Sequence, residues 1–202
     1  MVGFVGLALS DPEPDEPDGR RRRSQDSRSR IVSAMVELVR EGDILPSAAD
    51  VAARAGVGLR SVFRHFKDME SLYREMSEII EADLRAVVAR PFKGETWRER
   101  VLELIDRRSG GFEQIAPMRR ASDARRHASP VLQDDHRRLT VTLREILRAQ
   151  LPRGAIDRPT FEALELLLSY EAWNRLRTEQ GLGPGEARKV LRGAVRALIG
   201  EA

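Results

Sequence analysis

The chain has 202 residues, enough for one large domain or for a small domain joined to a larger one. It has no cysteine, which excludes disulfides, cysteine zinc sites and thiol catalysis and fits a reducing cytoplasm. Its residues are 33% charged and 5% aromatic, and no run approaches the roughly 18 apolar residues of a membrane helix, so we expect a helical, cytoplasmic protein without a membrane segment.

The basic residues are strongly biased toward arginine, with 32 Arg and 3 Lys behind a formal net charge of only +3. The planar guanidinium suits phosphate groups and guanine edges, so the bias is compatible with a nucleic-acid partner. A GC-rich genome would produce the same bias without any selection for function. Composition therefore leaves both interpretations open.

Residues 1–23 are predicted to be a disordered tail. The apolar start "MVGFVGLALS" has no basic residues before it and an acidic, proline-rich run after it, which argues against a secretory signal. That run cannot bury enough apolar surface to become ordered. The arginines Arg20–Arg23 could follow a nucleic-acid groove as a flexible arm, or they could be a solvated charge run that aids solubility.

Order is expected to begin near Ser24 or Ser27, either of which can cap a helix. The apolar residues of this helix repeat at helical spacing: Ile31, Met35, Leu38 and Val39. A second, short helix is expected over 48–54, because Ser47 and Asp50 match a capping box, in which each side chain pairs with a free backbone N–H.

A third helix is expected over 58–66, after a turn at Gly56, where glycine takes a positive φ at little cost. Val62 and Phe66 are four residues apart and can face the first two helices. The remaining positions form a basic, polar outer face: Leu59, Arg60, Ser61, Phe63, Arg64 and His65. Two short helices joined by such a turn form a helix-turn-helix, whose second helix fits the major groove of DNA.

The segment "SAADVAARAGVGLRSVFRHFKDMESLY" resembles the DNA-binding segment of the TetR family of bacterial transcriptional regulators, and the likeness spans residues 27–75. It is specific because several residue types recur at fixed offsets. The resemblance implies an all-α fold of about nine helices. A three-helix DNA-binding head over 24–70 would join a larger effector-binding and dimerisation domain over 71–202.

The resemblance also assigns roles to residues of the head. Two serines stand where the family's threonines contact phosphate, and two arginines stand at groove-facing positions that can read bases. His65 stands where the family's histidine meets the DNA backbone, and Leu59 could lie against a thymine methyl. The candidate DNA-binding residues are Ser47, Gly58, Leu59, Arg60, Ser61, Phe63, Arg64, His65 and Lys67.

Three departures from the family pattern put affinity in doubt more than fold. Gly58 replaces a capping Ser, Phe63 replaces a Tyr, and Met69 replaces a Lys that reaches phosphate. Neighbouring Lys67 and the arginine arm could compensate. Simpler interpretations also stand: His65 as an exposed helix residue, Phe63 as a core aromatic, and Arg64 as a solvated charge.

The remainder of the chain predicts long helices. The first, over 71–90, would connect the head to the rest, so that its motion could alter DNA binding. Further helices are expected over 95–116, softened at Gly110 and Gly111, and over 118–127, 129–151, 157–181 and 183–200.

Apolar residues from Phe161 to Leu176 are spread over more than one helix face, which predicts that a partner covers some of them, and the final helix has an apolar side that can pack with that partner. A four-helix bundle built from these helices of two subunits is what the resemblance implies, and two heads could then read a palindrome. The alternative is that Tyr170 and Trp173 are plain core within one subunit. The candidate dimer residues are Phe161, Leu164, Leu168, Trp173, Val190, Leu191, Ala194 and Leu198.

The resemblance also implies a pocket for a small-molecule effector between the head and the dimer bundle. The candidates that could line it are Phe112, Met118, His127, His136, Tyr170 and Trp173, although helix packing uses the same residue types. No cofactor is expected. The resulting hypothesis is a homodimeric regulator, most simply a repressor that binds a palindromic operator and leaves it when an effector binds.

The sequence leaves two other classes of protein to consider. An enzyme is disfavoured, because the chain lacks HExxH, Walker and G-x-S-x-G motifs. A metal site at His127, Asp134, Asp135 and His136 is conceivable, but a charged helix surface explains these residues better. The other class is a TetR-like helical interaction protein that has lost sequence-specific DNA binding, which salt-sensitive but sequence-independent binding would favour.

Overall fold

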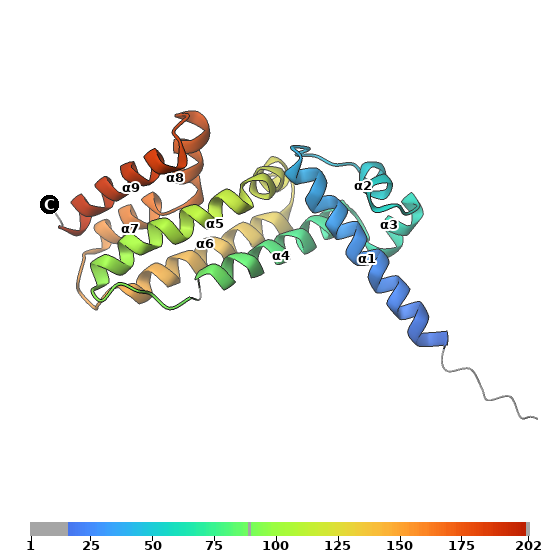
Figure 1. The fold of residues 1–202 in the computed structure, drawn as a ribbon, viewed down its shortest axis with the longest axis horizontal. Coiled ribbons are helices and arrows are strands. Elements are labelled where there is room, and N and C mark those ends of the chain that lie inside the picture. Colours follow the sequence, from blue (N-terminus) through green and yellow to red (C-terminus); the bar gives the residue numbers. More distant parts are fainter. Residues whose placement is uncertain (1–15, 89, 201–202) are drawn as a thin grey trace, which may run out of the picture.

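The computed structural model describes residues 16–88 and 90–200. Over these residues the chain forms nine α-helices and one π-helical turn and has no strand, which confirms the all-α expectation. Figure 1 shows a long helical body with a small head at one end. No helix in the described part combines the length and hydropathy needed to cross a bilayer. The elements are α1 (Glu16–Arg40), α2 (Ala48–Ala55), α3 (Leu59–His65), α4 (Met69–Val88), α5 (Trp97–Arg126), α6 (Pro130–Gln150), α7 (Arg158–Leu167), α8 (Tyr170–Asn174), η1 (Arg175–Glu179) and α9 (Pro184–Ile199).

The head consists of α1, α2, α3 and the start of α4 around a small apolar core. Ile31 and Met35 of α1 meet Val51 of α2 and Val62 of α3, and Phe66 closes the end of α3. All five are at most 2% exposed, so the inward face predicted for α3 is confirmed. Burying these side chains offsets the entropy of ordering two helices that are too short to be stable alone.

Local sequence signals set the ends of α2. The Ser47 hydroxyl accepts a hydrogen bond from the Asp50 backbone N–H at 3.2 Å, and the Asp50 carboxylate accepts one from the Ser47 N–H at 3.1 Å. Gly56 follows the helix with φ 62°, the left-handed conformation that favours glycine. The predicted capping box and turn are both confirmed.

α1 begins at Glu16, so the prediction of disorder through residue 23 is wrong for residues 16–23. Pro17 falls in the first turn, where a backbone N–H is not needed, and the arginines that follow favour helix. Extending an existing helix adds about one hydrogen bond for each residue that becomes ordered. An isolated arginine run would first have to form a costly helical nucleus. Residues 1–15 lie outside the described residues, so the predicted tail is not described there.

α4 joins the head to the body without a break in packing. Leu72, Tyr73 and Met76 of α4 are fully buried in the head core. Met118 of α5 and Leu132 of α6 pack into the same cluster. The head therefore rests directly on two body helices, and a change in their spacing would reach it through side-chain contact.

α5 is one continuous helix of 30 residues, although separate helices were predicted over 95–116 and 118–127. Gly110 and Gly111 do not end it, and Pro117 lies inside it. Both residue types weaken a helix locally. Tertiary burial outweighs them here, because Phe112, just after the glycines, and Met118, just after the proline, are each at most 3% exposed.

The segment 157–181 is also divided differently from the single helix predicted for it. α7 ends at Leu167, and Ser169 caps α8 by accepting a hydrogen bond from the Ala172 N–H at 3.1 Å. The Ser169 hydroxyl also donates to the Leu166 carbonyl at 2.7 Å. Serine competes with helix through such local bonds, so one Ser between apolar residues was enough to start a new helix.

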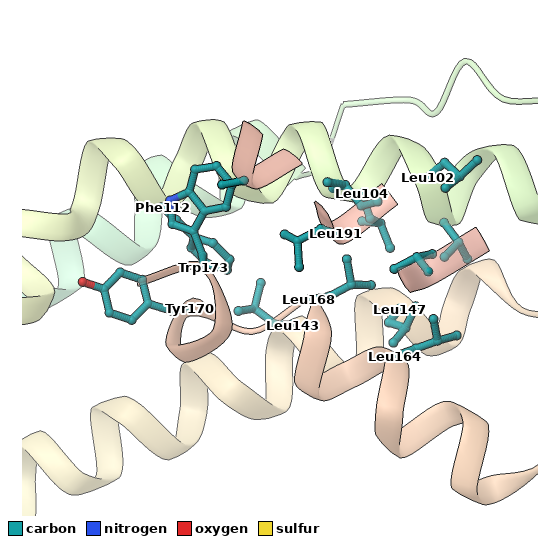
Figure 2. Close-up of a cluster of buried hydrophobic side chains, with 14 of the residues drawn as sticks. Leu102, Leu104, Phe112, Leu143, Leu147, Leu164, Leu168, Tyr170, Trp173 and Leu191 are labelled. Atoms are coloured by element: carbon teal, nitrogen blue, oxygen red, sulfur yellow. The ribbon is translucent and has the colours of Figure 1, made fainter. Parts of the chain in front are cut away.

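The body core lies between α5, α6, α7, α8 and α9. Figure 2 shows leucines from different helices of this core pointing toward one another, with Trp173 beside Phe112. The Phe112 and Tyr170 rings pack edge to face, 5.7 Å apart. The described chain thus has two apolar cores, one in the head and one in the body.

A buried arginine lies inside the body core. Arg108 of α5 is 1% exposed. Its guanidinium donates to the Leu168 carbonyl at 2.9 Å and to the Leu143 carbonyl. Burial lowers its pKa to about 10, which still leaves it charged at neutral pH. Arg108 therefore links α5 to α6 and to the end of α7, where the helix break leaves carbonyls without intrahelical partners.

Replacing Arg108 with Ala should lower the free energy of unfolding by about 3 to 5 kcal/mol, because it leaves a cavity and removes two hydrogen bonds from buried carbonyls. Arg108→Met should lose less, since it fills the space and no longer buries a charge. Urea unfolding at one fixed protein concentration measures both variants. A loss below about 1 kcal/mol for the Ala variant would show that Arg108 does not hold these helices together.

Candidate nucleic-acid interface and effector cavity

α3 presents a basic and apolar face to solvent. Arg60 and Arg64 are exposed and one helical turn apart, so their side chains lie on the same side of α3. Leu59 and Phe63 are also one turn apart, and they are 47% and 50% exposed. The core interpretation of Phe63 is therefore wrong. This face can place two guanidinium groups and two apolar groups against the edges of base pairs.

The two predicted phosphate-contacting serines differ in surroundings. Ser47 is exposed at the start of α2, with its hydroxyl already used in the capping box. Hydrogen bonds from Ser47 lower the pKa of Asp50, so this carboxylate stays ionised at neutral pH. Ser61 is half-buried in the first turn of α3. Gly58 precedes that turn and supplies no side-chain cap, as its replacement of Ser implies.

Three residues near the end of α3 complete the predicted set. Lys67 is exposed, whereas Met69 is half-buried and packs against the head core. His65 is half-buried, and its Nε2 is buried without a hydrogen-bond partner in the described structure. Burial, followed by the charges of Arg64 and Arg28, lowers the pKa of His65, so the ring is neutral at pH 7. A contact between His65 and phosphate stays a prediction.

Sequence reasoning missed two arginines of α1 that hold α3 in place. Arg28 donates to the His65 carbonyl at 2.7 Å, stacks 4.3 Å from the centre of the Phe66 ring and pairs with Glu75. Arg30 donates to the carbonyls of Ala55 and Gly56. Helical spacing gives no signal for such contacts, because each partner lies far away in the sequence.

A small cavity lies where α4, α5 and α6 meet. Its volume is about 30 Å³, roughly the room of one water molecule. Met118 and Leu132 line it and also belong to the head core. The other lining residues are Ser77, Arg119, Ser122, Asp123, Arg126, Asp135, His136 and Leu139. Met118 and Leu132 thus form one wall of the cavity and are at the same time part of the head core.

The cavity is bordered by charged groups that are incompletely paired. Arg119 Nη2 lies 2.6 Å from His136 Nδ1 and 3.4 Å from a carboxylate oxygen of Glu171. Arg119 Nε and Asp135 Oδ2 are buried without a hydrogen-bond partner in the described structure. Burial raises the pKa of Asp135, and burial followed by the charge of Arg119 lowers that of His136. A polar ligand could satisfy these atoms.

Comparison with known proteins finds a family that is similar to the head. Residues 31–76 match the model of the family "Bacterial regulatory proteins, tetR family". These residues of the head are thus similar to the DNA-binding segment of the TetR family. A search of curated proteins finds no match. The family match confirms the resemblance over these residues and supports a DNA-binding transcriptional regulator.

Solved structures extend the likeness to the whole TetR fold. A putative TetR-family transcriptional regulator from Rhodococcus sp. is 20% identical, with 86% of this chain and 99% of that chain covered and a TM-score of 0.66. A transcriptional regulator from Rhodococcus sp. Rha1 is also 20% identical, with 87% and 98% covered and a TM-score of 0.70. The multidrug binding protein EbrR, complexed with imidazole, is 20% identical, with 89% and 90% covered and a TM-score of 0.57.

The predicted effector residues of this TetR-like chain do not form one site. Met118 and His136 line the cavity, but Phe112, Tyr170 and Trp173 pack in the body core, with Trp173 donating to a Glu113 oxygen at 2.8 Å. His127 is exposed beyond the end of α5. These four do not line the cavity, and their contact with an effector stays a prediction, because aromatic residues serve equally well as core and sequence does not distinguish the two uses. Arg119 and Asp135 were missed.

The predicted dimer residues also divide. Those that pack in the chain's own core, at most 7% exposed, are Phe161, Leu164, Leu168, Trp173 and Leu191. They are covered within one subunit, as the alternative for Tyr170 and Trp173 expects, so their part in a dimer interface stays a prediction. In a single straight helix the apolar residues of α7 and α8 would point in different directions. The break between α7 and α8 changes the direction of the chain, so that residues of both helices point into the same core. Val190 is 49% exposed, and Ala194 and Leu198 are half-buried.

A larger hollow lies at the end of the body where α6 meets α7. It has a volume of about 690 Å³ and is open to solvent. Arg144 and Arg148 line it and stack on the Phe161 ring, 4.8 and 4.5 Å from its centre. None of its lining residues belongs to the head core, so a ligand bound there would lack the direct contact with the head that the small cavity has.

Proposed function

We propose that the chain is a homodimeric transcriptional repressor that acts in the cytoplasm, binds a palindromic operator and is released by a small-molecule effector. The observation that carries the DNA-binding part is the exposed face of α3, where Arg60 and Arg64 lie one turn apart. Exposed side chains of this kind contribute little to folding. Their arrangement suits recognition of base edges in a major groove.

An exposed apolar surface on α7 and α9 supports the dimer. Leu166 of α7 is 64% exposed and Val190 of α9 is 49% exposed, on two helices that pack against each other. Small residues continue this surface, with Ala163 on α7 and Gly193 and Ala194 on α9. Such residues allow close approach of helices from a second copy, and a two-fold axis there would give two heads for the two halves of a palindrome.

The position of the small cavity supports release by an effector. Met118 and Leu132 contact both the cavity and the buried side of α4. A ligand larger than one water must move these walls apart, and the packed head core would have to follow. We therefore expect ligand binding and operator binding to oppose each other by the same free energy, as linkage requires.

The effector proposal is tested with a ligand that raises the melting temperature of the protein in a small-molecule screen. That ligand should lower operator affinity, and His136→Phe should weaken the ligand's effect about 10-fold or more by removing the ring nitrogen that accepts from Arg119. His127→Phe is the matched control, because His127 is exposed and does not line the cavity. Equal effects of both variants, or ligand binding without operator release, would refute the proposal.

A further inference from the structure

The first turns of α1 form a helical extension of the head that the proposed function does not use. We call residues 16–27 the arm helix. It precedes the family match, which starts at residue 31. Figure 1 shows these turns running past α3 and away from the body. Arg21, Arg22 and Arg23 are exposed on them.

The arm helix has a fixed direction relative to α3. It continues without a break into the part of α1 where Arg28 contacts the His65 carbonyl at 2.7 Å and the Phe66 ring at 4.3 Å. Arg30 adds a hydrogen bond to the Gly56 carbonyl at 3.2 Å. These contacts attach α1 to the end of α3 and to the turn before it. The predicted flexible arm is therefore a helix in the structure, and its direction relative to α3 is set by these contacts.

Helix geometry places the arginines beyond the end of α3. Arg21 is seven residues, or two turns, before Arg28, so both lie on nearly the same face and about 10 Å apart along the axis. Arg22 and Arg23 follow at steps of about 100°, and the three side chains together fan over about 200° of the helix surface. A polyanion that passes along either side of the arm meets at least one guanidinium.

The composition of this region selects the class of partner. Residues 18–30, "DGRRRRSQDSRSR", contain six arginines and two aspartates, a net charge of +4 (6 − 2). They contain no apolar residue. A partner helix or a membrane surface would require an apolar stripe, which this segment lacks. Phosphate groups require only cationic donors.

We propose that the arm helix is a second DNA-contacting element, in which Arg21, Arg22 and Arg23 bind backbone phosphates flanking the base pairs read by α3. This inference rests on the proposed function, since α3 must first position the head on a duplex. The arm adds affinity and lengthens the protected site but reads no sequence. It compensates for Phe63 and Met69, which lack the phosphate-binding groups of the family pattern.

The test compares three variants of the full chain on a palindrome selected from a random duplex library. The first replaces Arg21, Arg22 and Arg23 with Ala, and the second replaces them with Lys. The third is a matched control that replaces three exposed arginines of the body with Ala, Arg137, Arg158 and Arg175. Both Ala variants change the net charge from +3 to 0.

Hydroxyl-radical footprinting and the salt dependence of affinity are the readouts. The arm Ala variant should bind about 10- to 100-fold more weakly, and its slope of log affinity against log salt should become shallower by about 2 to 5 for a dimer, at roughly 0.9 per lost contact. It should lose protection flanking the palindrome and keep protection within it. The Lys variant should keep most of the slope, because phosphate contact depends chiefly on charge.

The inference would be overturned if the arm Ala variant kept the wild-type salt slope and the wild-type protection flanking the palindrome. It would also be overturned if the body control lost as much affinity as the arm Ala variant, or if the Lys variant bound as weakly as the Ala variant. Failure of the proposed function gives a different result. In that case wild-type protein would not distinguish the selected palindrome from an unrelated duplex in the same titration, whatever the arm variants do.

Discussion

Replacing Arg60 or Arg64 with Ala is expected to weaken binding to the preferred operator by about 1 to 3 kcal/mol, or roughly 5- to 150-fold, for each substitution. Both side chains are exposed on one face of α3 and can make paired hydrogen bonds to guanine. Each substitution should also relax specificity at one base step, because the contact that distinguishes that base pair is lost. Titrations against operators altered at single positions measure both effects.

Two further variants make this prediction specific to base reading. Ser47→Ala should weaken all sequences similarly, because a phosphate contact carries no sequence information. Ser47 also caps α2, so binding must be measured well below the melting temperature of that variant. Arg40→Ala is the control, since Arg40 is exposed at the far end of α1. Equal, small losses on every sequence from the Arg60 and Arg64 variants would refute base reading.

Replacing Leu166 and Val190 together with Glu is expected to separate the dimer and to lower affinity for a palindrome by on the order of 100-fold or more. In a two-fold interface each substitution occurs twice, so four carboxylates would be buried or would repel one another. Loss of the second head also removes the avidity of two linked sites. Analytical ultracentrifugation gives the oligomeric state, and the same titration gives affinity.

Val141→Glu is the matched control for this surface, because Val141 is a similarly exposed apolar residue, 48% exposed, on α6. It should leave both the oligomeric state and the affinity unchanged. A double Glu variant that remains dimeric and binds normally would place the interface elsewhere on the chain. If Val141→Glu dissociated the dimer, the interface would extend to α6.

The head could be predicted from the sequence because its signals are local. A capping box at Ser47 and a glycine that takes positive φ at Gly56 each depend on residues a few positions apart. The inward positions Val62 and Phe66 follow from helical spacing within one short element. For these features the neighbouring residues hold enough information to decide the structure.

The body was harder because tertiary packing decides its details. Buried neighbours keep α5 continuous through Pro117, and one hydroxyl at Ser169 divides the segment after α7. The same apolar residue type serves as core at Leu164 and as surface at Leu166, two positions later. Local pattern cannot assign such residues to a partner or to the chain's own interior.

The candidate sites were predicted only in part for a related reason. The exposed face of α3 follows from sequence, but the contacts of Arg28 with the end of α3 join residues 37 positions apart. The cavity depends on Arg119, Asp135 and His136 meeting across α5 and α6. Charged residues in helices usually face water, so their spacing alone did not indicate a buried cluster.

Sequence-specific DNA binding by a dimer is tested most directly by binding of the purified protein to the DNA upstream of its own gene. An unrelated duplex of equal length is the control, and both are titrated at two salt concentrations. We predict protection of a palindrome by two protomers that persists at the higher salt. Binding that disappears alike for both duplexes as salt rises would contradict sequence-specific recognition, because it would show electrostatic attraction without sequence reading.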